Sequence, residues 1–125
     1  MTRILLIEDD DQVRNMLRAV LEQEGYSVGE ARNGREGVAH CRTTPAVLVI
    51  TNILMPEQEG LETIRILRQE FPAVKIIAIS GGGQRGNLDF LAVAQQLGAL
   101  RTLRKPFAMQ ELRTAVEDVL QTPGA

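Results

Sequence analysis

Short, continuous apolar runs separated by segments of helical periodicity are the feature that most constrains the fold of this chain. Four runs stand out, at residues 4–7, 47–50, 76–79 and, more weakly, 100–103, and a more polar stretch at 26–31 is a fifth candidate. The runs are apolar throughout rather than alternating, which is typical of parallel strands that are buried on both faces. The sequence therefore predicts five strands, with the one at 26–31 nearer an edge of the sheet.

Helical patterns separate these strands. Apolar residues recur at helical spacing over residues 13–21, 61–67 and 109–119, and the segments 34–42 and 88–97 have suitable lengths. Gly25 is a plausible C-terminal stop for the first helix. Strand and helix alternate five times, and this alternation predicts an α/β fold, a doubly wound parallel sheet with helices on both faces.

The composition of the chain argues against several classes of protein. The chain has 125 residues, 44% of them hydrophobic, and a formal net charge of −2. A nucleic-acid-binding domain would normally be strongly basic, so we expect no nucleic-acid partner. The single cysteine, Cys41, cannot form an internal disulfide, and no apolar run is long enough for an export signal or a membrane span. We therefore expect a cytoplasmic protein without a membrane partner.

Polar side chains follow the apolar runs where the strands should end. These are, in chain order, Glu8 and Asp9, Asn52, Ser80, and Lys105. In open α/β sheets ligands bind at the carboxyl ends of the strands, and paired acids beside a lysine and a hydroxyl suit a hard divalent cation that carries a phosphoryl group. Acids after a strand can instead cap the next helix, a role that we assign to Asp10 or Asp11.

Four segments carry a family resemblance. "RILLIEDDDQVR", "LVITNILMPEQEGLETI", "IIAISGGG" and "LRKPF" resemble the hallmark segments of bacterial two-component receiver domains, similar to the chemotaxis response regulator. The resemblance covers essentially the whole chain. It implies a receiver domain over residues 1–121 with a frayed tail at 122–125, and a flavodoxin-like sheet with strand order 2-1-3-4-5.

The resemblance also implies a function. Such domains are signalling modules rather than enzymes, and they accept a phosphoryl group from a sensor histidine kinase or phosphotransfer protein onto an aspartate, with Mg²⁺ bound. No effector segment follows residue 125, so we expect either a receiver that stands alone or one cut from a longer protein.

Residue by residue, the resemblance assigns the site as follows. Glu8 and Asp9 resemble the acidic metal-binding pair, and the backbone carbonyl of Leu54 would be a further metal ligand. Asn52 falls at the phospho-acceptor position. Ser80 matches the hydroxyl residue that contacts the phosphoryl group, and Lys105 matches the family lysine.

Neighbouring residues follow the family pattern too. Met55-Pro56 and Gly60 match the loop after the acceptor strand, and the Lys105-Pro106 peptide is expected to be cis.

Asn52 is the main departure from the family. A carboxylate oxygen attacks phosphorus, whereas a neutral carboxamide is a very poor nucleophile. Because its amide oxygen can still ligate a metal and accept a bond from Lys105, we expect the site geometry to survive, Mg²⁺ binding to weaken and phosphorylation to be lost. Two hypotheses remain: a phosphorylation-dead receiver that its kinase still recognises, and a protein-binding pseudo-receiver whose output never depended on phosphate.

Other features have plainer interpretations. Thr102 stands where active receivers often place an aromatic switch residue. Residues 81–86 satisfy G-x-G-x-x-G, but they follow the fourth strand rather than the first, which favours a mobile loop over a dinucleotide site. A flavin- or nucleotide-binding protein of the same fold is the weakest alternative. We expect His40, the only histidine, to be an ordinary surface residue, and Cys41 to be a small buried hydrophobe.

Overall fold

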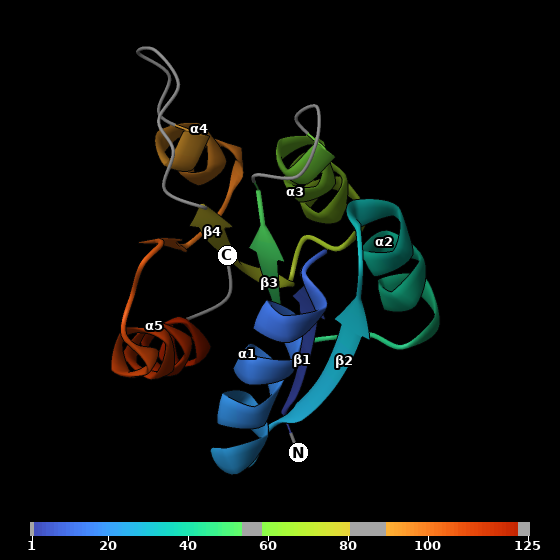
Figure 1. The fold of residues 1–125 in the computed structure, drawn as a ribbon. Coiled ribbons are helices and arrows are strands. Elements are labelled where there is room, and N and C mark those ends of the chain that lie inside the picture. Colours follow the sequence, from blue (N-terminus) through green and yellow to red (C-terminus); the bar gives the residue numbers. More distant parts are fainter. Residues whose placement is uncertain (1, 54–58, 81–89, 123–125) are drawn as a thin grey trace.

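The computed structural model describes residues 2–53, 59–80 and 90–122. Strand and helix alternate five times along the chain, as predicted (Figure 1). The elements are β1 (Arg3–Ile7), α1 (Asp11–Gln23), β2 (Ser27–Ala31), α2 (Gly34–Thr43), β3 (Leu48–Asn52), α3 (Glu59–Glu70), β4 (Lys75–Ser80), α4 (Phe90–Leu97), β5 (Arg101–Arg104) and α5 (Met109–Gln121).

Several predictions fall on parts of the chain that are not described. The Leu54 carbonyl, the Met55-Pro56 step, the loop predicted at residues 81–86 and residues 123–125 of the predicted tail all lie outside the described residues.

The five strands form one parallel sheet in the order β2-β1-β3-β4-β5. This confirms the predicted fold class and strand order, including the edge position of the more polar β2. The other edge strand is β5, which is short and carries arginine at both ends. In parallel sheets all carboxyl ends face the same edge, so the polar residues at these ends are gathered on one side of the molecule.

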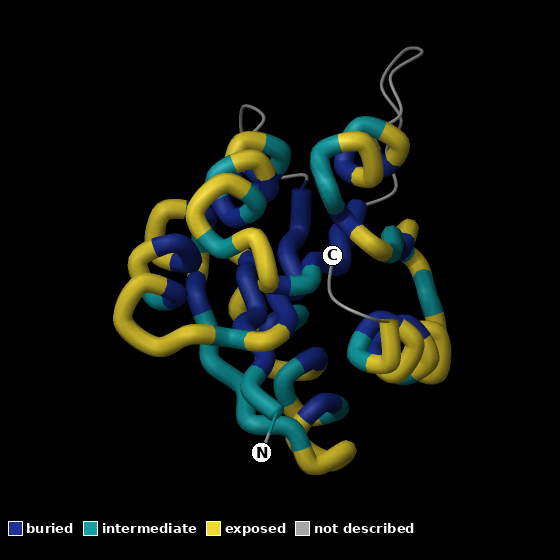
Figure 2. The backbone as a smooth tube through the Cα atoms, turned by 180° about the vertical axis from the view of Figure 1, so that it is seen from behind, coloured by how far each residue is buried: buried dark blue, intermediate teal, exposed yellow. Residues whose placement is uncertain are grey.

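Helices cover both faces of the sheet (Figure 1). On one face Ile4 and Leu6 of β1 pack in a core shared with α1 and α5, and on the other Leu5 and Ile7 pack in a core shared with α2, α3 and α4. All four β1 side chains are at most 1% exposed, and each such burial stabilises the fold by about 1.5–3 kcal/mol. Figure 2 shows the buried strands inside and the exposed residues on the outer helix surfaces.

Three strands reach further toward their polar ends than their apolar runs indicated. β3 begins at Leu48 rather than Val47, which is 46% exposed, and it continues to Asn52. Thr51 and Asn52 pair with Ala78 and Ile79 of β4. Backbone pairing does not depend on side-chain polarity, so β3 and β4 continue past their apolar runs to Asn52 and Ser80, the polar residues predicted at their ends. Likewise β4 includes Ser80, and β5 runs over Arg101–Arg104 rather than from Leu100.

The residues at the two ends of α1 start and stop the helix as predicted. The Asp10 carboxylate accepts from the backbone N–H groups of Gln12 at 2.9 Å and Val13 at 3.1 Å, so Asp10 rather than Asp11 caps the helix. Gly25, just after α1, adopts φ +94°, a conformation that favours glycine. None of the helices in the described part of the chain is long and apolar enough to cross a membrane.

The expectation for His40 was wrong. His40 is half-buried, its Nε2 lies 3.3 Å from Nη2 of Arg3, and its Nδ1 is buried. Gly29 of β2 leaves room for these two side chains, because a Cβ at this position would lie 2.6 Å from Arg3 Nη2 and 2.9 Å from His40 Cε1. Cys41 is 2% exposed, and burial raises the pKa of its thiol, which confirms it as a buried apolar residue.

Candidate functional site

The side chains predicted for the site lie at the carboxyl edge of the sheet. Glu8 follows β1, Asn52 ends β3, and Ser80 ends β4. Asn52 pairs with Ile79, so Ser80 lies one residue beyond it on the neighbouring strand. The backbone N–H of Lys105 donates to the carbonyl oxygen of Ser80 at 2.9 Å, which extends the β4–β5 pairing and brings Lys105 to the same edge.

Asn52 and Glu8 are joined directly. Nδ2 of Asn52 lies 3.2 Å from both Oε1 and Oε2 of Glu8, and the two residues are only 6% and 1% exposed. An ionised carboxylate accepts hydrogen bonds and donates none, so the amide nitrogen rather than the amide oxygen must face Glu8. Asn52 is therefore held against the Glu8 carboxylate.

Lys105 completes this cluster. Its Nζ lies 3.6 Å from Oε1 of Glu8, and its side chain is 28% exposed. A buried carboxylate is costly unless a positive charge and hydrogen bonds compensate it. Glu8 receives both, the charge from Lys105 and N–H groups from Asn52 and from the backbone of Asp10, whose N–H donates to Oε2 at 3.1 Å.

Burial has a measurable electrostatic consequence. It raises the pKa of the Glu8 carboxyl above its ordinary value, and the neighbouring Asp9 carboxyl adds to the rise. The Asp10 N–H, the Lys105 ammonium and the Asn52 amide act in the opposite direction without cancelling the effect. The ionised form of Glu8 is thus disfavoured, and added positive charge near it would relieve that cost.

The oxygen donors gathered here are of the kind that hard cations prefer. Asp9 is exposed beside Glu8, and the amide oxygen of Asn52 is a third oxygen donor. Such oxygen ligands suit Mg²⁺, so the residues fit the ion that the resemblance implies. Among the described residues no three His, Cys, Asp or Glu side chains form a metal-binding group.

Gly60 fixes the approach of α3 to this edge. A Cβ at Gly60 would lie 2.3 Å from Cα and 2.8 Å from the carbonyl oxygen of Ile53, the residue that follows Asn52. A backbone atom cannot move aside cheaply, so only glycine allows this contact. The sequence singled out Gly60 through the family resemblance alone, and the structure supplies a physical reason for it.

Arg14 of α1 is a residue that the sequence interpretation missed. It is 8% exposed, and its Nη1 donates to the backbone carbonyl oxygen of Glu8 at 2.8 Å. The available signal was its position, three residues before Leu17 and seven before Leu21, which places it on the buried stripe of α1. A charged residue on that stripe needs a partner inside the protein.

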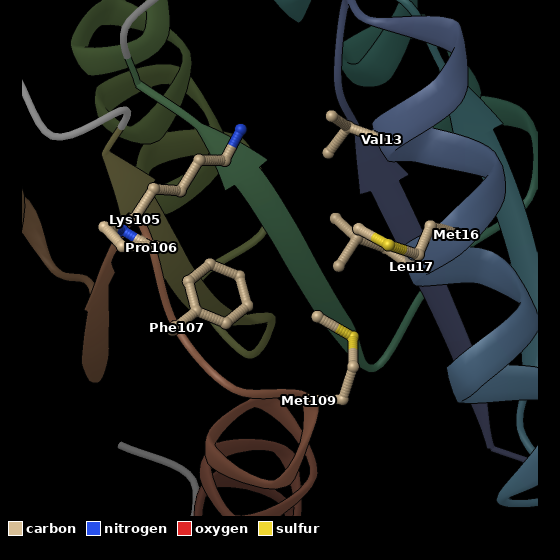
Figure 3. A pocket seen from close by; sticks show the side chains of 7 residues that line it. All are labelled: Val13, Met16, Leu17, Lys105, Pro106, Phe107 and Met109. Atoms are coloured by element: carbon tan, nitrogen blue, oxygen red, sulfur yellow. The ribbon is translucent and has the colours of Figure 1, made fainter.

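An apolar groove of about 530 Å³ adjoins Lys105. Figure 3 shows side chains of α1 on one side of it and residues around the start of α5 on the other. The Lys105-Pro106 peptide in its wall is cis, as expected. The lining residues are Val13, Met16, Leu17, Lys105, Pro106, Phe107 and Met109.

Comparison with known proteins agrees with this arrangement. The family model described as response regulator receiver domain matches residues 4–117. The chain is 34% identical to the response regulator receiver protein CpdR of Brucella abortus, over 96% of this chain and 98% of that protein. It is also 34% identical to the KDP operon transcriptional regulatory protein KdpE of Escherichia coli, over 100% of this chain but only 54% of KdpE.

A solved structure shows the same fold. The crystal structure of a CheY-like response regulator receiver domain protein from Methanospirillum hungatei JF-1 superposes with a TM-score of 0.85 at 26% identity, over 94% of this chain and 92% of that one. The fold and the sequence match agree. The chain therefore belongs to the receiver domains of two-component response regulators.

Proposed function

We propose that this receiver domain takes part in two-component signalling without accepting a phosphoryl group at its acceptor position. The observation that supports this is the pair of hydrogen bonds from the Asn52 amide to Glu8. The amide nitrogen is engaged as a donor, and its lone pair is delocalised into the carbonyl group. The amide oxygen is neutral, so position 52 offers no competent nucleophile toward phosphorus.

Receiver domains typically bind Mg²⁺. In this chain Glu8, Asp9 and the Asn52 amide oxygen would hold the ion, with the Leu54 carbonyl as the further ligand that the resemblance implies. When bound, the ion would supply positive charge to phosphoryl oxygens. Two unit charges about 4 Å apart interact by roughly 4 kcal/mol at an effective dielectric near 20. Even after heavy discounting, the loss of one carboxylate should weaken binding at least about tenfold.

Ser80 and Lys105 would contact the phosphoryl group if one were present. A ligand shifts a two-state protein only through contacts that differ between the states. Without an acceptor these contacts cannot form, and the Lys105 ammonium instead stays paired with Glu8. We therefore propose that the domain is held in one signalling state, whichever kinase acts in the same cell.

The proposed partners are a sensor histidine kinase or phosphotransfer protein and an unidentified output protein. Asparagine and aspartate have nearly the same shape, so a partner that recognises the surface around position 52 would still bind. We propose a non-enzymatic domain spanning residues 1–121, located in the cytoplasm, with no nucleic-acid or membrane partner.

The alternative is a pseudo-receiver whose output never depended on phosphate. The contacts within the cluster of Glu8, Asn52 and Lys105 favour it, because Glu8 already has a positive charge and hydrogen-bond donors beside it without a ligand. In both versions the site is not phosphorylated. Asn52→Asp should restore switching of partner binding in the first version and leave partner binding unchanged in the pseudo-receiver.

Beryllofluoride, which forms a phosphoryl-like adduct on carboxylates, tests the proposal. With Mg²⁺ it should shift the backbone amide NMR signals of β4 and β5 in the Asn52→Asp variant and leave the unaltered protein unchanged. Asn52→Ala is the matched control, and it should also stay unchanged. Equal shifts in the unaltered protein would overturn the proposal. If the Asn52→Asp variant switches but its affinity for the output protein is the same, the pseudo-receiver version is correct.

A further inference from the structure

Arg14 makes three directed contacts from a nearly buried position. Nη1 donates to the Glu8 carbonyl oxygen at 2.8 Å, Nε to Oε1 of Glu30 at 3.2 Å, and Nη2 to Oδ1 of Asp11 at 2.5 Å. Its side chain is 10% exposed. The planar guanidinium group thus links α1 to β2 and to the backbone at the end of β1, which a single-point ammonium cannot do.

The backbone of Glu8 is held on both sides. Its N–H donates to the carbonyl oxygen of Ala31 in β2 at 3.0 Å, and its carbonyl oxygen accepts from Arg14. The next turn is fixed as well, since the Asp10 carbonyl oxygen accepts from the backbone N–H of Arg14 at 2.9 Å. The direction in which the Glu8 and Asp9 side chains leave the chain therefore depends on where Arg14 sits.

Neighbouring carboxylates offset the positive charge of Arg14, which lies close to the proposed metal site. Asp11 and Glu30 contribute two negative charges, which offset Arg14 and its neighbour Arg18, since Arg18 also pairs with Glu30. Arg18 makes this contact from a side chain that is 42% exposed. It shares the ion-pair cluster with Arg14, and its hydrogen bonds go to the carboxylates of Glu22 and Glu30, which makes it a matched control.

We propose that Arg14 is a positioning residue for the cation site, and that it acts by holding the Glu8 carbonyl so that the Glu8 and Asp9 carboxylates converge on one ion. This inference rests on the proposed function in one respect, the assignment of Glu8 and Asp9 as Mg²⁺ ligands. Groups that orient metal ligands from outside typically change metal affinity by about 10- to 100-fold when they are substituted.

The direction in which Arg14→Met changes the Mg²⁺ affinity distinguishes a positioning role from a purely electrostatic one. Arg14→Met removes a positive charge near the site, so an electrostatic effect alone would tighten Mg²⁺ binding. Loss of positioning would weaken it. Arg14→Lys keeps the charge but loses the three-point geometry, and it should weaken binding in the same direction. Arg18→Met removes a positive charge from the same cluster and should leave the affinity within about threefold.

The experiment is a Mg²⁺ titration followed by amide NMR shifts, in the unaltered protein and in the Asn52→Asp background, with thermal unfolding to verify folding. We expect Arg14→Lys and Arg14→Met to bind Mg²⁺ about tenfold or more weakly than their parent. Parent-like or tighter binding in both variants overturns the inference. If a variant fails to fold, Glu30→Gln, which removes one anchor of Arg14, should show a smaller weakening, and an unchanged affinity there also overturns it.

Amide hydrogen exchange without metal makes this inference separable from the proposed function. In metal-free protein, Arg14→Lys should speed exchange at the Asp10 amide, which bonds to Glu8, while Arg18→Met should not. Faster exchange at the Asp10 amide, together with no Mg²⁺ binding in either parent, would contradict the proposed metal ligands. It would still support the role of Arg14 in holding the backbone from Glu8 to Asp10. Unchanged exchange at Asp10 would refute the role of Arg14 whatever the metal does.

Discussion

The side-chain amide of Asn52 donates to both carboxylate oxygens of Glu8, at 3.2 Å each. An aspartate in the same place would set two carboxylates against each other at a buried position, and each would raise the pKa of the other. A cation between them would relieve that repulsion. Asn52 instead donates hydrogen bonds to Glu8, so this pair needs less compensating positive charge than two carboxylates would.

An aspartate at position 52 should therefore destabilise the metal-free protein. We expect Asn52→Asp to lower the free energy of unfolding by about 1–3 kcal/mol in EDTA at neutral pH, because hydrogen bonds are lost and a buried like-charge pair is formed. Added Mg²⁺ should recover part of the loss in the variant and change the unaltered protein less. Urea denaturation with and without Mg²⁺ measures both effects. A variant that is as stable as its parent in EDTA would show that the two side chains do not face each other.

Metal affinity should follow the same reasoning. The Asn52→Asp variant should bind Mg²⁺ at least about tenfold more tightly than the unaltered protein, which corresponds to about 1.4 kcal/mol. Isothermal titration calorimetry at fixed ionic strength gives the two dissociation constants. Equal affinities would mean that the side chain at position 52 does not contribute to the ion's coordination.

The raised pKa of Glu8 predicts a pH dependence of stability. Its folded-state pKa lies above the ordinary 4.5 because of burial, so the folded protein binds more protons than the unfolded chain between these two values. The stability contribution of Glu8 is fully present below about pH 4 and is lost as pH rises through the raised pKa.

Glu8→Gln removes this titration and serves as the reference. In EDTA the unfolding free energy of the unaltered protein, minus that of Glu8→Gln, should fall as pH rises from about 4 to 7. Urea denaturation of both proteins over that range measures the difference. A difference that grows with pH would show that Lys105 and Asn52 lower the pKa of Glu8 by more than burial raises it.

Gly60 offers a test of packing near the site. Gly→Ala in a helix ordinarily stabilises a protein by up to about 1 kcal/mol. Here the new Cβ would lie 2.3 Å from the Cα of Ile53, so the start of α3 or the end of β3 must shift. We expect Gly60→Ala to destabilise the protein by about 1–3 kcal/mol. A gain in stability in thermal unfolding would show that α3 does not approach the Ile53 backbone so closely.

Much of the fold was predictable from sequence because its causes are local. Apolar runs gave the strands, helical periodicity gave α1, α3 and α5, and Asp10 and Gly25 marked the two ends of α1. The strand order came from the family resemblance rather than from periodicity. The starts of two strands were misplaced by one residue, because Val47 and Leu100 are apolar but lie just outside β3 and β5.

That Glu8, Asn52 and Lys105 would lie at one edge of the sheet was predictable from the sequence, but their contacts were not. Strand topology brings Glu8 and Asn52 together although 44 residues separate them, and the pattern alone did not show that the amide nitrogen would face the carboxylate. Arg14 escaped notice because its role depends on tertiary contacts, with Glu8 just after β1 and with Glu30 of β2. His40 was misjudged because the space that it fills is created by the absent side chain of Gly29.

The most direct test of the proposed loss of phosphorylation is intact-protein mass spectrometry after incubation with Mg²⁺ and acetyl phosphate. The unaltered protein should keep its mass, and Asn52→Asp should gain one phosphoryl group that is lost on mild alkaline treatment, as expected for an acyl phosphate. Asn52→Ala, which also lacks a carboxylate, should behave like the unaltered protein. A phosphoryl adduct on the unaltered protein that is absent from Asn52→Ala would contradict the proposal that Asn52 cannot serve as the acceptor.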